Sequence, residues 1–319
     1  MPEKAVELSV VIPMYQEEGV VEELYRELTR ALSALKKSYE IILVNDGSTD
    51  RTLEKILAIK KKDRRVIVID LMGNFGQTAA LSAGFDHARG NIIVSMDGDL
   101  QDDPNDIGLL IKKLEEGYDI VSGWRKERKE NLVLRRIPSQ AANVLLAKIS
   151  GVKIHDFGAP LKAYRGEVIK NVTLYAQFHR FIPALAMELK ARVTEVVVKN
   201  YKRKYGKSKY GIGRTYTVFF DLVRLRFILK YLNQPLKVFG TIGSALGMVG
   251  AVFFAYVFID KLFFHVPIMV EHAPMFITSI FLIISGINFF TVGLLGELII
   301  KSLYESGEKK NYYIRTIYE

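Results

Sequence analysis

The first part of the chain alternates short apolar runs with stretches in which apolar residues recur at helical spacing. The apolar runs cover residues 8–12, 41–44, 66–71, 92–96, 118–123 and 193–198. Each of the first four is followed by a polar loop and then by a helix-period pattern. Strands that alternate with helices predict a parallel sheet covered on both faces, with ligands bound beyond the carboxyl ends of the strands. We therefore expect the polar loops to line one edge of the sheet.

Two long apolar stretches lie near the C-terminus. Residues 238–259 and 273–296 contain no charged side chain. They predict helices at 238–259 and about 273–298, each long enough to cross a hydrocarbon core of about 30 Å. Two buried helices of a soluble protein are the alternative interpretation. Gly243 and Gly247 form a small-residue face suited to close contact between the two spans or between subunits.

Charge is distributed unevenly along the chain. The formal net charge of +10 arises in residues 120–235, whereas residues 1–119 are acidic overall. The basic region must face phosphates, lipid head groups or nucleic acid. Within it, amphipathic helices are expected at 131–150 and 211–235, either at a membrane interface or on a soluble surface.

The charge pattern also predicts how the chain is organised about a membrane. Basic residues precede the first apolar stretch and follow the second, so the positive-inside rule places both ends on the cytoplasmic side. We expect a folded domain at 1–210, a juxtamembrane helix at 211–235, a two-helix membrane segment at 236–300 and a cytoplasmic tail at 301–319. The N-terminus lacks the apolar core of a signal peptide, so export of the domain is not expected. The absence of cysteine excludes disulfides and thiolate chemistry.

The clearest candidate chemistry follows the apolar run at 92–96. Asp97 and Asp99 flank Gly98 where that strand should end, and Gln101 adds an amide oxygen nearby. Two carboxylates one residue apart can share a divalent cation, and glycine between them leaves room for a ligand. The alternative is an acidic loop that caps a helix, because Asp102, Asp103 and Pro104 resemble a helix start.

Two further loops fall at the same predicted edge. Asp46, in the segment NDGSTD, could bind the imide N–H of a uracil or a ribose hydroxyl, or it could simply belong to a turn before a helix. The segment GNFGQTAALSAG places Gly73 and Gly76 at a helix start, which suits a tight turn or a phosphate. Dinucleotide and P-loop motifs are absent from the sequence.

The basic region contains two more segments of interest. The pair His155 and Asp156 is, taken alone, most often an ordinary loop pair. Residues 201–210 interleave tyrosines with five basic residues, a pattern that could bind single-stranded nucleic acid. Their position just before an amphipathic helix and an apolar stretch favours a phosphate at a membrane surface instead.

Together these segments resemble those of a known enzyme family. PMYQEE at 13–18, NDGSTD at 45–50, DGDLQ at 97–101, HDFGAPLKAYR at 155–165, HRF at 179–181 and RKYGKSKY at 203–210 resemble the motifs of polyisoprenyl-phosphate glycosyltransferases. These are inverting family-two enzymes of the GT-A fold, a Rossmann-like α/β fold, and are related to dolichol-phosphate mannose synthase. The two apolar stretches resemble the bacterial bactoprenol glucosyltransferases in particular. Two positions depart from the family pattern: Gln16 stands where Asn is common, and Ala159 where Cys is common.

The resemblance implies roles for individual residues. Nucleotide contacts would come from Pro13, Tyr15, Glu17, Asp46, Ser48 and Asp97, and the metal ligands would be Asp97, Asp99 and Gln101. The diphosphate or lipid phosphate would meet Arg125, Arg203 and Lys209, while Arg135 would help to dock the acceptor. Asp156 would lie near the reacting sugar, so that Asp99, Asp156 and Arg125 form the catalytic group.

The same resemblance implies an activity at the inner (cytoplasmic) membrane. The expected reaction is inverting transfer of a hexose, with glucose from UDP-glucose as the first choice, to undecaprenyl phosphate, with Mg²⁺ or Mn²⁺ as cofactor. GDP-mannose and UDP-linked aminosugars are alternative donors. A homo-oligomer, with a tetramer as the favoured state, is expected, and nucleic acid is not expected as a partner. A processive polysaccharide synthase and a non-enzymatic basic membrane scaffold are the rival interpretations.

Overall fold

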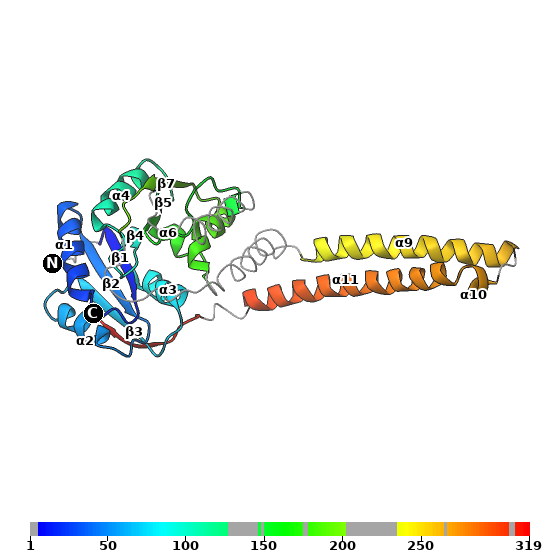
Figure 1. Ribbon diagram of the computed structural model, residues 1–319, viewed down its shortest axis with the longest axis horizontal. Helices are drawn as coiled ribbons and strands as arrows, with labels where there is room; N and C mark the ends of the chain where they lie inside the picture. Colours follow the sequence, from blue (N-terminus) through cyan, green and yellow to red (C-terminus); the bar gives the residue numbers. More distant parts are fainter. Residues whose placement is uncertain are drawn as a thin grey trace. The chain divides into compact units, whose positions relative to one another are not determined.

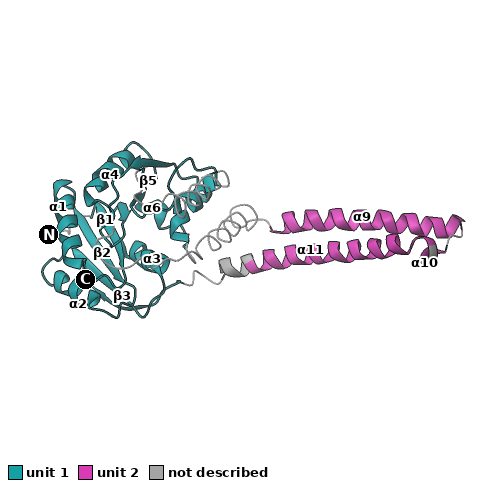
Figure 2. Ribbon diagram, viewed as in Figure 1, with its two compact units in different colours: residues 1–222, 310–319 teal, residues 223–309 magenta. Residues whose placement is uncertain are grey.

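The computed structural model describes residues 6–126, 146–147, 150–174, 178–201, 235–264, 267–305 and 310–319. The chain forms two units, which are coloured separately in Figure 2. Unit 1 combines residues 1–222 with residues 310–319, and unit 2 holds residues 223–309. The amphipathic helices predicted at 131–150 and 211–235 fall largely outside the described residues.

Unit 1 is built on an eight-stranded sheet with the strand order β7-β5-β6-β4-β1-β2-β3-β8 (Figure 1). The strands are β1 (Leu8–Met14), β2 (Tyr39–Asn45), β3 (Val66–Leu71), β4 (Ile92–Ser95), β5 (Ile120–Trp124), β6 (Lys162–Arg165), β7 (Val193–Val197) and β8 (Ile314–Tyr318). All six predicted strands are present, and the first four along the chain, β1 to β4, are parallel to one another, as expected. β6 and β8 were not predicted, and both are antiparallel to their neighbours in the sheet.

Helices follow the strands as the hydrophobic periodicity predicts. The main ones are α1 (Val21–Ala34), α2 (Thr52–Lys60), α3 (Gln77–His87) and α4 (Ile107–Glu115). The short helices of unit 1 include η1 (Pro104–Asp106), α6 (Gly166–Ile169), η3 (Phe178–Phe181), α7 (Ile182–Leu185) and η4 (Ala186–Leu189).

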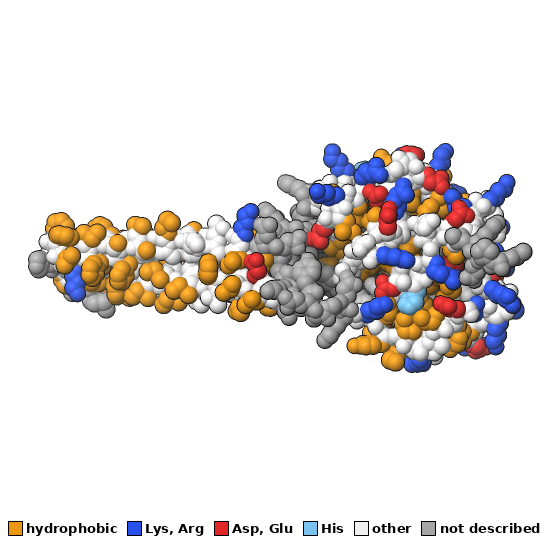
Figure 3. All heavy atoms as spheres, turned by 180° about the vertical axis from the view of Figure 1, so that it is seen from behind, with side chains coloured by type: hydrophobic (Ala, Val, Ile, Leu, Met, Phe, Trp, Pro, Cys, Tyr) orange, Lys and Arg blue, Asp and Glu red, His pale blue; other side chains and the backbone are white. Residues whose placement is uncertain are grey.

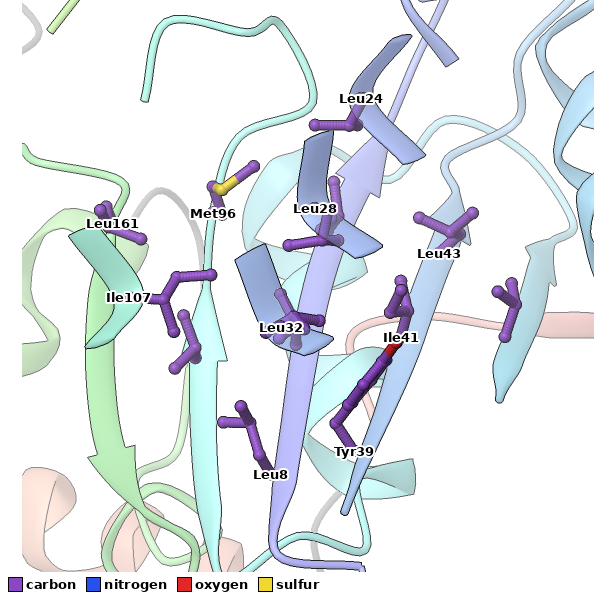
Figure 4. Packing of buried hydrophobic residues seen from close by; sticks show 14 of the residues in the cluster. Leu8, Leu24, Leu28, Leu32, Tyr39, Ile41, Leu43, Met96, Ile107 and Leu161 are labelled. Atoms are coloured by element: carbon purple, nitrogen blue, oxygen red, sulfur yellow. The ribbon is translucent and has the colours of Figure 1, made fainter. Parts of the chain in front are cut away.

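Both faces of the sheet are covered, because residues alternate across each strand. Leu8, Ile41 and other side chains on one face pack against Leu24, Leu28 and Leu32 of α1, as Figure 4 shows. On the other face, Gly84 of α3 lies so close to β1 that an added Cβ would overlap the side chain of Val11. The parallel strands therefore keep their carboxyl ends together at one edge of a sheet buried between helix layers.

Unit 2 is a helical hairpin of α9 (Pro235–Phe264) and α11 (Ala273–Glu305), with the short α10 (Ile268–Glu271) between them. Pro235–Phe264 and Ala273–Ile299 are long and apolar enough to span a membrane, which agrees with the two predicted spans. Figure 3 shows mostly hydrophobic side chains along this unit and many charged ones over unit 1.

Small residues let the two hairpin helices approach closely. A Cβ on Gly243 would lie 2.5 Å from the carbonyl oxygen of Gly286, and a Cβ on Gly286 would lie 2.9 Å from the amide nitrogen of Gly247. The small-residue face predicted at Gly243 and Gly247 is therefore used between the two spans. The predicted tetramer stays a prediction.

Candidate active site

The site is assembled from loops at the carboxyl edge of the sheet. β1, β2, β3 and β4 are parallel, so the loops that follow them lie at the same edge. β6 runs antiparallel between β4 and β5, which brings its first residue, Lys162, opposite Ser95 and Ser122 near the ends of those strands. The segment that leads into β6 therefore faces the loop after β4.

Asp46 directly follows β2 at this edge and contacts the neighbouring loop. Its two carboxylate oxygens accept hydrogen bonds from the backbone amides of Phe75 (2.7 Å) and Gly76 (3.0 Å) in the loop between β3 and α3. Burial raises the pKa of the Asp46 carboxyl group, and these two hydrogen bonds oppose that rise. Gly47 has φ of +65°, and an added Cβ would lie 2.4 Å from the carbonyl carbon of Gly73. Glycine is therefore required where the two loops touch.

The loop after β1 is tied to the loop after β2. The backbone amide of Gln16 donates to the Ser48 hydroxyl (3.1 Å), and that of Glu17 donates to the Thr52 hydroxyl (2.9 Å). Gln16 has φ of +52°, a left-handed conformation that asparagine adopts more readily than glutamine. The Asn that the motif resemblance implies at this position would adopt this conformation with less strain. Four of the predicted nucleotide residues lie in these connected loops: Tyr15, Glu17, Asp46 and Ser48.

The acidic residues predicted to bind metal follow β4. The Gln77 side-chain amide donates to Asp97 Oδ1 (2.6 Å), and the Gln101 backbone amide donates to Asp99 Oδ1 (3.1 Å). Leu100, between Asp99 and Gln101, has φ of +59°. A leucine in the left-handed region is strained, and such strain is found preferentially at functional sites.

Asp102 adds a third carboxylate that the sequence did not single out as a ligand. It is 2% exposed, and neither oxygen accepts a hydrogen bond of good geometry among the described residues, although the backbone of Asp97 partly offsets the rise that burial causes in its pKa. The helix cap predicted for this segment belongs to Asp103 instead, whose Oδ1 accepts a hydrogen bond from the Asn105 amide (3.0 Å). Asp102 is therefore left with a buried charge and no capping role.

The charges in this cluster are not balanced. Burial, followed by repulsion from Asp99 and Asp102, raises the pKa of Asp97 to about 8. Burial also raises the pKa of Asp102 to about 7, although Arg125 opposes the rise. Lys162 is 2% exposed, and its burial lowers its pKa to about 8. The cluster favours a further positive charge, because a cation would stabilise the ionised carboxylates.

Arg125 and Asp156, two of the three predicted catalytic residues, form an ion pair with two contacts. Arg125 Nε donates to Asp156 Oδ2 (2.8 Å) and Nη2 donates to Oδ1 (3.2 Å). Asp156 is 4% exposed. Beside them, the rings of Trp124 and His155 stack with centroids 4.2 Å apart. The carboxylate thus orients the guanidinium group. Burial acts to lower the pKa of Arg125, but the nearby carboxylates raise it by more, so Arg125 remains positively charged.

The residues present fit a divalent cation bound together with a substrate. No group of three or more His, Cys, Asp or Glu side chains poised to hold a metal occurs in the described part of the chain. Mg²⁺ and Mn²⁺ at diphosphates need only one or two protein carboxylates, because phosphate oxygens and water complete the shell. The carboxylates of Asp97 and Asp102, whose pKa values burial raises, meet that requirement.

The structure brings together most of the predicted site. Asp97, Asp99, Gln101, Arg125 and Asp156 come from the loops after β4 and β5 and from the segment before β6. Arg135, Arg203 and Lys209 lie outside the described residues, so their predicted phosphate contacts stay predictions.

Three residues of the cluster were not predicted as site residues: Gln77, Asp102 and Lys162. Lys162 lies within the HDFGAPLKAYR segment, so its motif membership was a usable signal. Asp102 carried no such signal, because it is adjacent to the true capping residue.

Comparison with known proteins identifies the family. The model of glycosyl transferase family 2 matches residues 9–173. Dodecaprenyl-phosphate galacturonate synthase of Rhizobium johnstonii is 39% identical over 322 residues, covering 100% of this chain and 95% of that protein. Undecaprenyl-phosphate 4-deoxy-4-formamido-L-arabinose transferase of Shewanella sediminis is 34% identical, covering 97% of this chain and 92% of that protein.

Solved structures give the same fold. Glucosyl-3-phosphoglycerate synthase from Mycobacterium tuberculosis superposes with a TM-score of 0.54 at 18% identity, over 69% of this chain and 80% of that one. This confirms the predicted GT-A fold. The chain belongs to glycosyl transferase family 2 and, within that family, to the polyprenyl-phosphate glycosyltransferases.

Proposed function

We propose that the carboxyl edge of the sheet binds a nucleotide sugar and a divalent cation and transfers the sugar, with inversion, to a polyprenyl phosphate. The observation that carries the proposal is an acidic cluster in a family of sugar transferases, in which Asp99 and Asp102 are buried and Asp97 is half-buried. A structural cluster would be neutralised by its own hydrogen bonds or by cations. Here the pKa of Asp97 rises to about 8 despite Arg125 and Lys162.

The reaction breaks the bond between the anomeric carbon and the β-phosphate oxygen of the donor and forms a bond from that carbon to an oxygen of the lipid phosphate. The leaving nucleoside diphosphate gains negative charge. A cation held by Asp97, Asp99 and Gln101 would neutralise part of that charge. Arg125, oriented by Asp156, would donate hydrogen bonds to the same phosphates.

No general base is required in this scheme. A phosphate monoester has a second pKa of about 6, so the acceptor is mostly dianionic at neutral pH. Asp156 already accepts two hydrogen bonds from Arg125, which suits an orienting role better than proton removal. An α-linked donor would give a β-linked lipid product.

For the transferred sugar, galacturonate is our first candidate. The relative from Rhizobium johnstonii, named as a galacturonate synthase, matches the full length of this chain at 39% identity. Glucose, expected from the motif resemblance, is the second candidate. The relatives described above are named for galacturonate and for 4-deoxy-4-formamido-L-arabinose.

The cation is proposed to be Mn²⁺ or Mg²⁺. Glucosyl-3-phosphoglycerate synthase from Mycobacterium tuberculosis, which shares the fold, was crystallised with Mn²⁺ and UDP-glucose. Carboxylate and amide oxygens are ligands that both ions accept.

The arrangement of the chain supports a catalytic unit and a C-terminus on one side of the inner membrane. β8 follows the hairpin in sequence, yet pairs antiparallel with β3 of the sheet that precedes it. A chain that crosses a bilayer twice returns to the side from which it started. The positive-inside rule favours the cytoplasmic side.

The direct test supplies membranes containing the full chain with labelled UDP-galacturonate, UDP-glucose, a UDP-aminosugar and GDP-mannose in turn. A single acid-labile lipid-linked monosaccharide, formed only with Mn²⁺ or Mg²⁺, is the expected product. A long polymer on a gel would favour the processive synthase instead. Absence of nucleotide-sugar binding by calorimetry, with and without Mn²⁺, would favour the membrane scaffold.

A further inference from the structure

The C-terminal segment 310–319 makes a set of contacts that the activity described above does not use. It begins after residues 306–309, which separate it from α11, and it joins unit 1. In β8, Ile314 pairs with Leu71, and Tyr318 pairs with Val68. The start of β8 therefore lies beside the carboxyl end of β3, at the same edge as the site.

Three contacts join this segment to the loop between β3 and α3. The Met72 amide donates to the Tyr313 carbonyl oxygen (2.9 Å), and Arg315 Nη2 donates to the Met72 carbonyl oxygen (3.0 Å). The ring of Tyr313 packs against that of Phe75 with centroids 5.9 Å apart. Both rings are accessible to solvent, at 66% and 39% exposure. These contacts hold the loop from outside, without being part of the buried core.

Further contacts hold the adjoining helix. The Tyr312 hydroxyl donates to Asp86 Oδ2 of α3 (2.6 Å), and Lys310 Nζ lies 3.3 Å from the same oxygen. At the other end of α3, Gln77 donates to Asp97. The segment thus contacts the helix whose first residue holds a predicted metal ligand.

The loop that the segment holds contains the two amides that bind Asp46. Phe75 and Gly76 donate to the two oxygens of that carboxylate, so the position of the loop and the position of Asp46 depend on each other. One chain of contacts leads from Tyr313 and Arg315 through the loop to Asp46.

We propose that the C-terminal segment is a positioning element of the donor site, with Tyr313 and Arg315 setting the loop that orients Asp46 toward the nucleotide. The proposal rests on the function proposed above, because it assigns Asp46 to the nucleotide. A strand that comes after the membrane hairpin would then be needed for tight donor binding, although none of its side chains need touch the donor.

The test compares full-length variants in detergent. In Tyr313→Ala/Arg315→Ala we expect the KM for the nucleotide sugar to rise about tenfold, with kcat within about twofold, because one ring contact, one hydrogen bond and the ion pair between Arg315 and Asp70 are lost. The KM for polyprenyl phosphate should not change. Tyr313→Phe keeps both the ring and Arg315, so its donor KM should equal that of the unmodified chain. Thr316→Ala, on the same strand, is the matched control and should behave as the unmodified chain.

A second measurement is independent of the activity. Hydrogen exchange of the Phe75 and Gly76 amides should be faster in Tyr313→Ala/Arg315→Ala than in the unmodified chain or in Thr316→Ala. Unchanged exchange would overturn the positioning role whatever the substrate. Faster exchange in a chain that binds no nucleotide sugar would retain the mechanical coupling and reject the donor function. A fall in kcat with an unchanged donor KM would also overturn the proposal.

Discussion

Asp46 and Asp102 are both buried carboxylates at the same edge of the sheet, but their surroundings differ. Asp46 accepts two backbone hydrogen bonds, one on each oxygen. Neither oxygen of Asp102 has a partner among the described residues. A carboxylate that accepts an amide hydrogen bond on each oxygen holds a loop in place and can still accept a bond from a ligand, whereas a buried carboxylate with few donors is unstable in its charged form until a cation arrives. The comparison separates the part of the site that is organised by the protein from the part that awaits a ligand.

The largest expected effect comes from removing a charge on the cation side. Asp99→Asn should reduce metal-dependent transfer by about 100-fold or more, because the charge that binds the cation near the diphosphate is lost. The variant should still fold and remain in membranes. The measurement is initial rate with Mn²⁺ at saturating donor.

Asp119→Asn provides the control for that experiment. Asp119 lies just before β5 and contacts Arg165 and Arg192, away from the carboxyl edge. The activity of Asp119→Asn should stay within about twofold of the unmodified chain, because Asp119 lies at the opposite edge of the sheet from the site. If Asp99→Asn kept activity at that level too, the metal assignment would be wrong.

The next effect concerns Asp46, which accepts hydrogen bonds from the two loop amides. Asp46→Asn leaves one of the two loop amides without its acceptor, which should lower the free energy of unfolding by about 1–2 kcal/mol. The donor KM should rise, but the dependence of rate on Mn²⁺ concentration should not shift. Thermal unfolding and metal titration of the rate measure the two properties. A shift in the metal dependence would mean that Asp46, like Asp102, contributes to cation binding.

Adjacent residues allow a matched test of the unsatisfied carboxylate. Asp103→Ala removes a helix cap and should lower the free energy of unfolding by about 1 kcal/mol. Asp102→Ala removes a buried charge without a partner, so in the metal-free protein the loss should be smaller or absent. The apparent affinity for Mn²⁺ should fall in Asp102→Ala alone. Equal destabilisation of both variants would mean that Asp102 is satisfied in solution.

The last effect is a dependence of stability on pH. The pKa values of Asp97 and Asp102 rise from the ordinary 3.8 to about 8 and about 7 in the folded protein. At any pH between the ordinary pKa of 3.8 and the raised values, the folded state therefore binds more protons than the unfolded state. The free energy of unfolding contributed by these groups is therefore greatest below the ordinary pKa and is lost as pH rises through 7 and 8.

Mn²⁺ should reduce this loss, because the cation stabilises the charged carboxylates. The measurement is the unfolding temperature of the full chain in detergent, with EDTA or with Mn²⁺, from the ordinary pKa of 3.8 up to pH 8. A fall of the same size in both conditions would indicate that the cation binds elsewhere. Asp102→Ala should show a shallower dependence on pH in EDTA.

The local pattern of the sequence determined much of this protein. Alternating apolar runs and helical periodicity predicted six strands and the helices between them, because burial and backbone conformation follow from short-range spacing. Uncharged stretches predicted the two hairpin helices for the same reason. The pair Asp97 and Asp99 was recognisable because its spacing after a strand suits a cation.

Tertiary structure decided what local pattern does not encode. β6 begins and ends with a basic residue and so forms no apolar run, and β8 pairs with a strand more than 200 residues earlier in the chain, so neither had a sufficient local signal. Arg125 and Asp156 meet across 31 positions. Asp102 and Asp103 are neighbours, but Asp103 caps a helix, whereas Asp102 is buried and accepts no hydrogen bond of good geometry among the described residues. Whether a carboxylate is satisfied depends on atoms that folding brings from elsewhere in the chain.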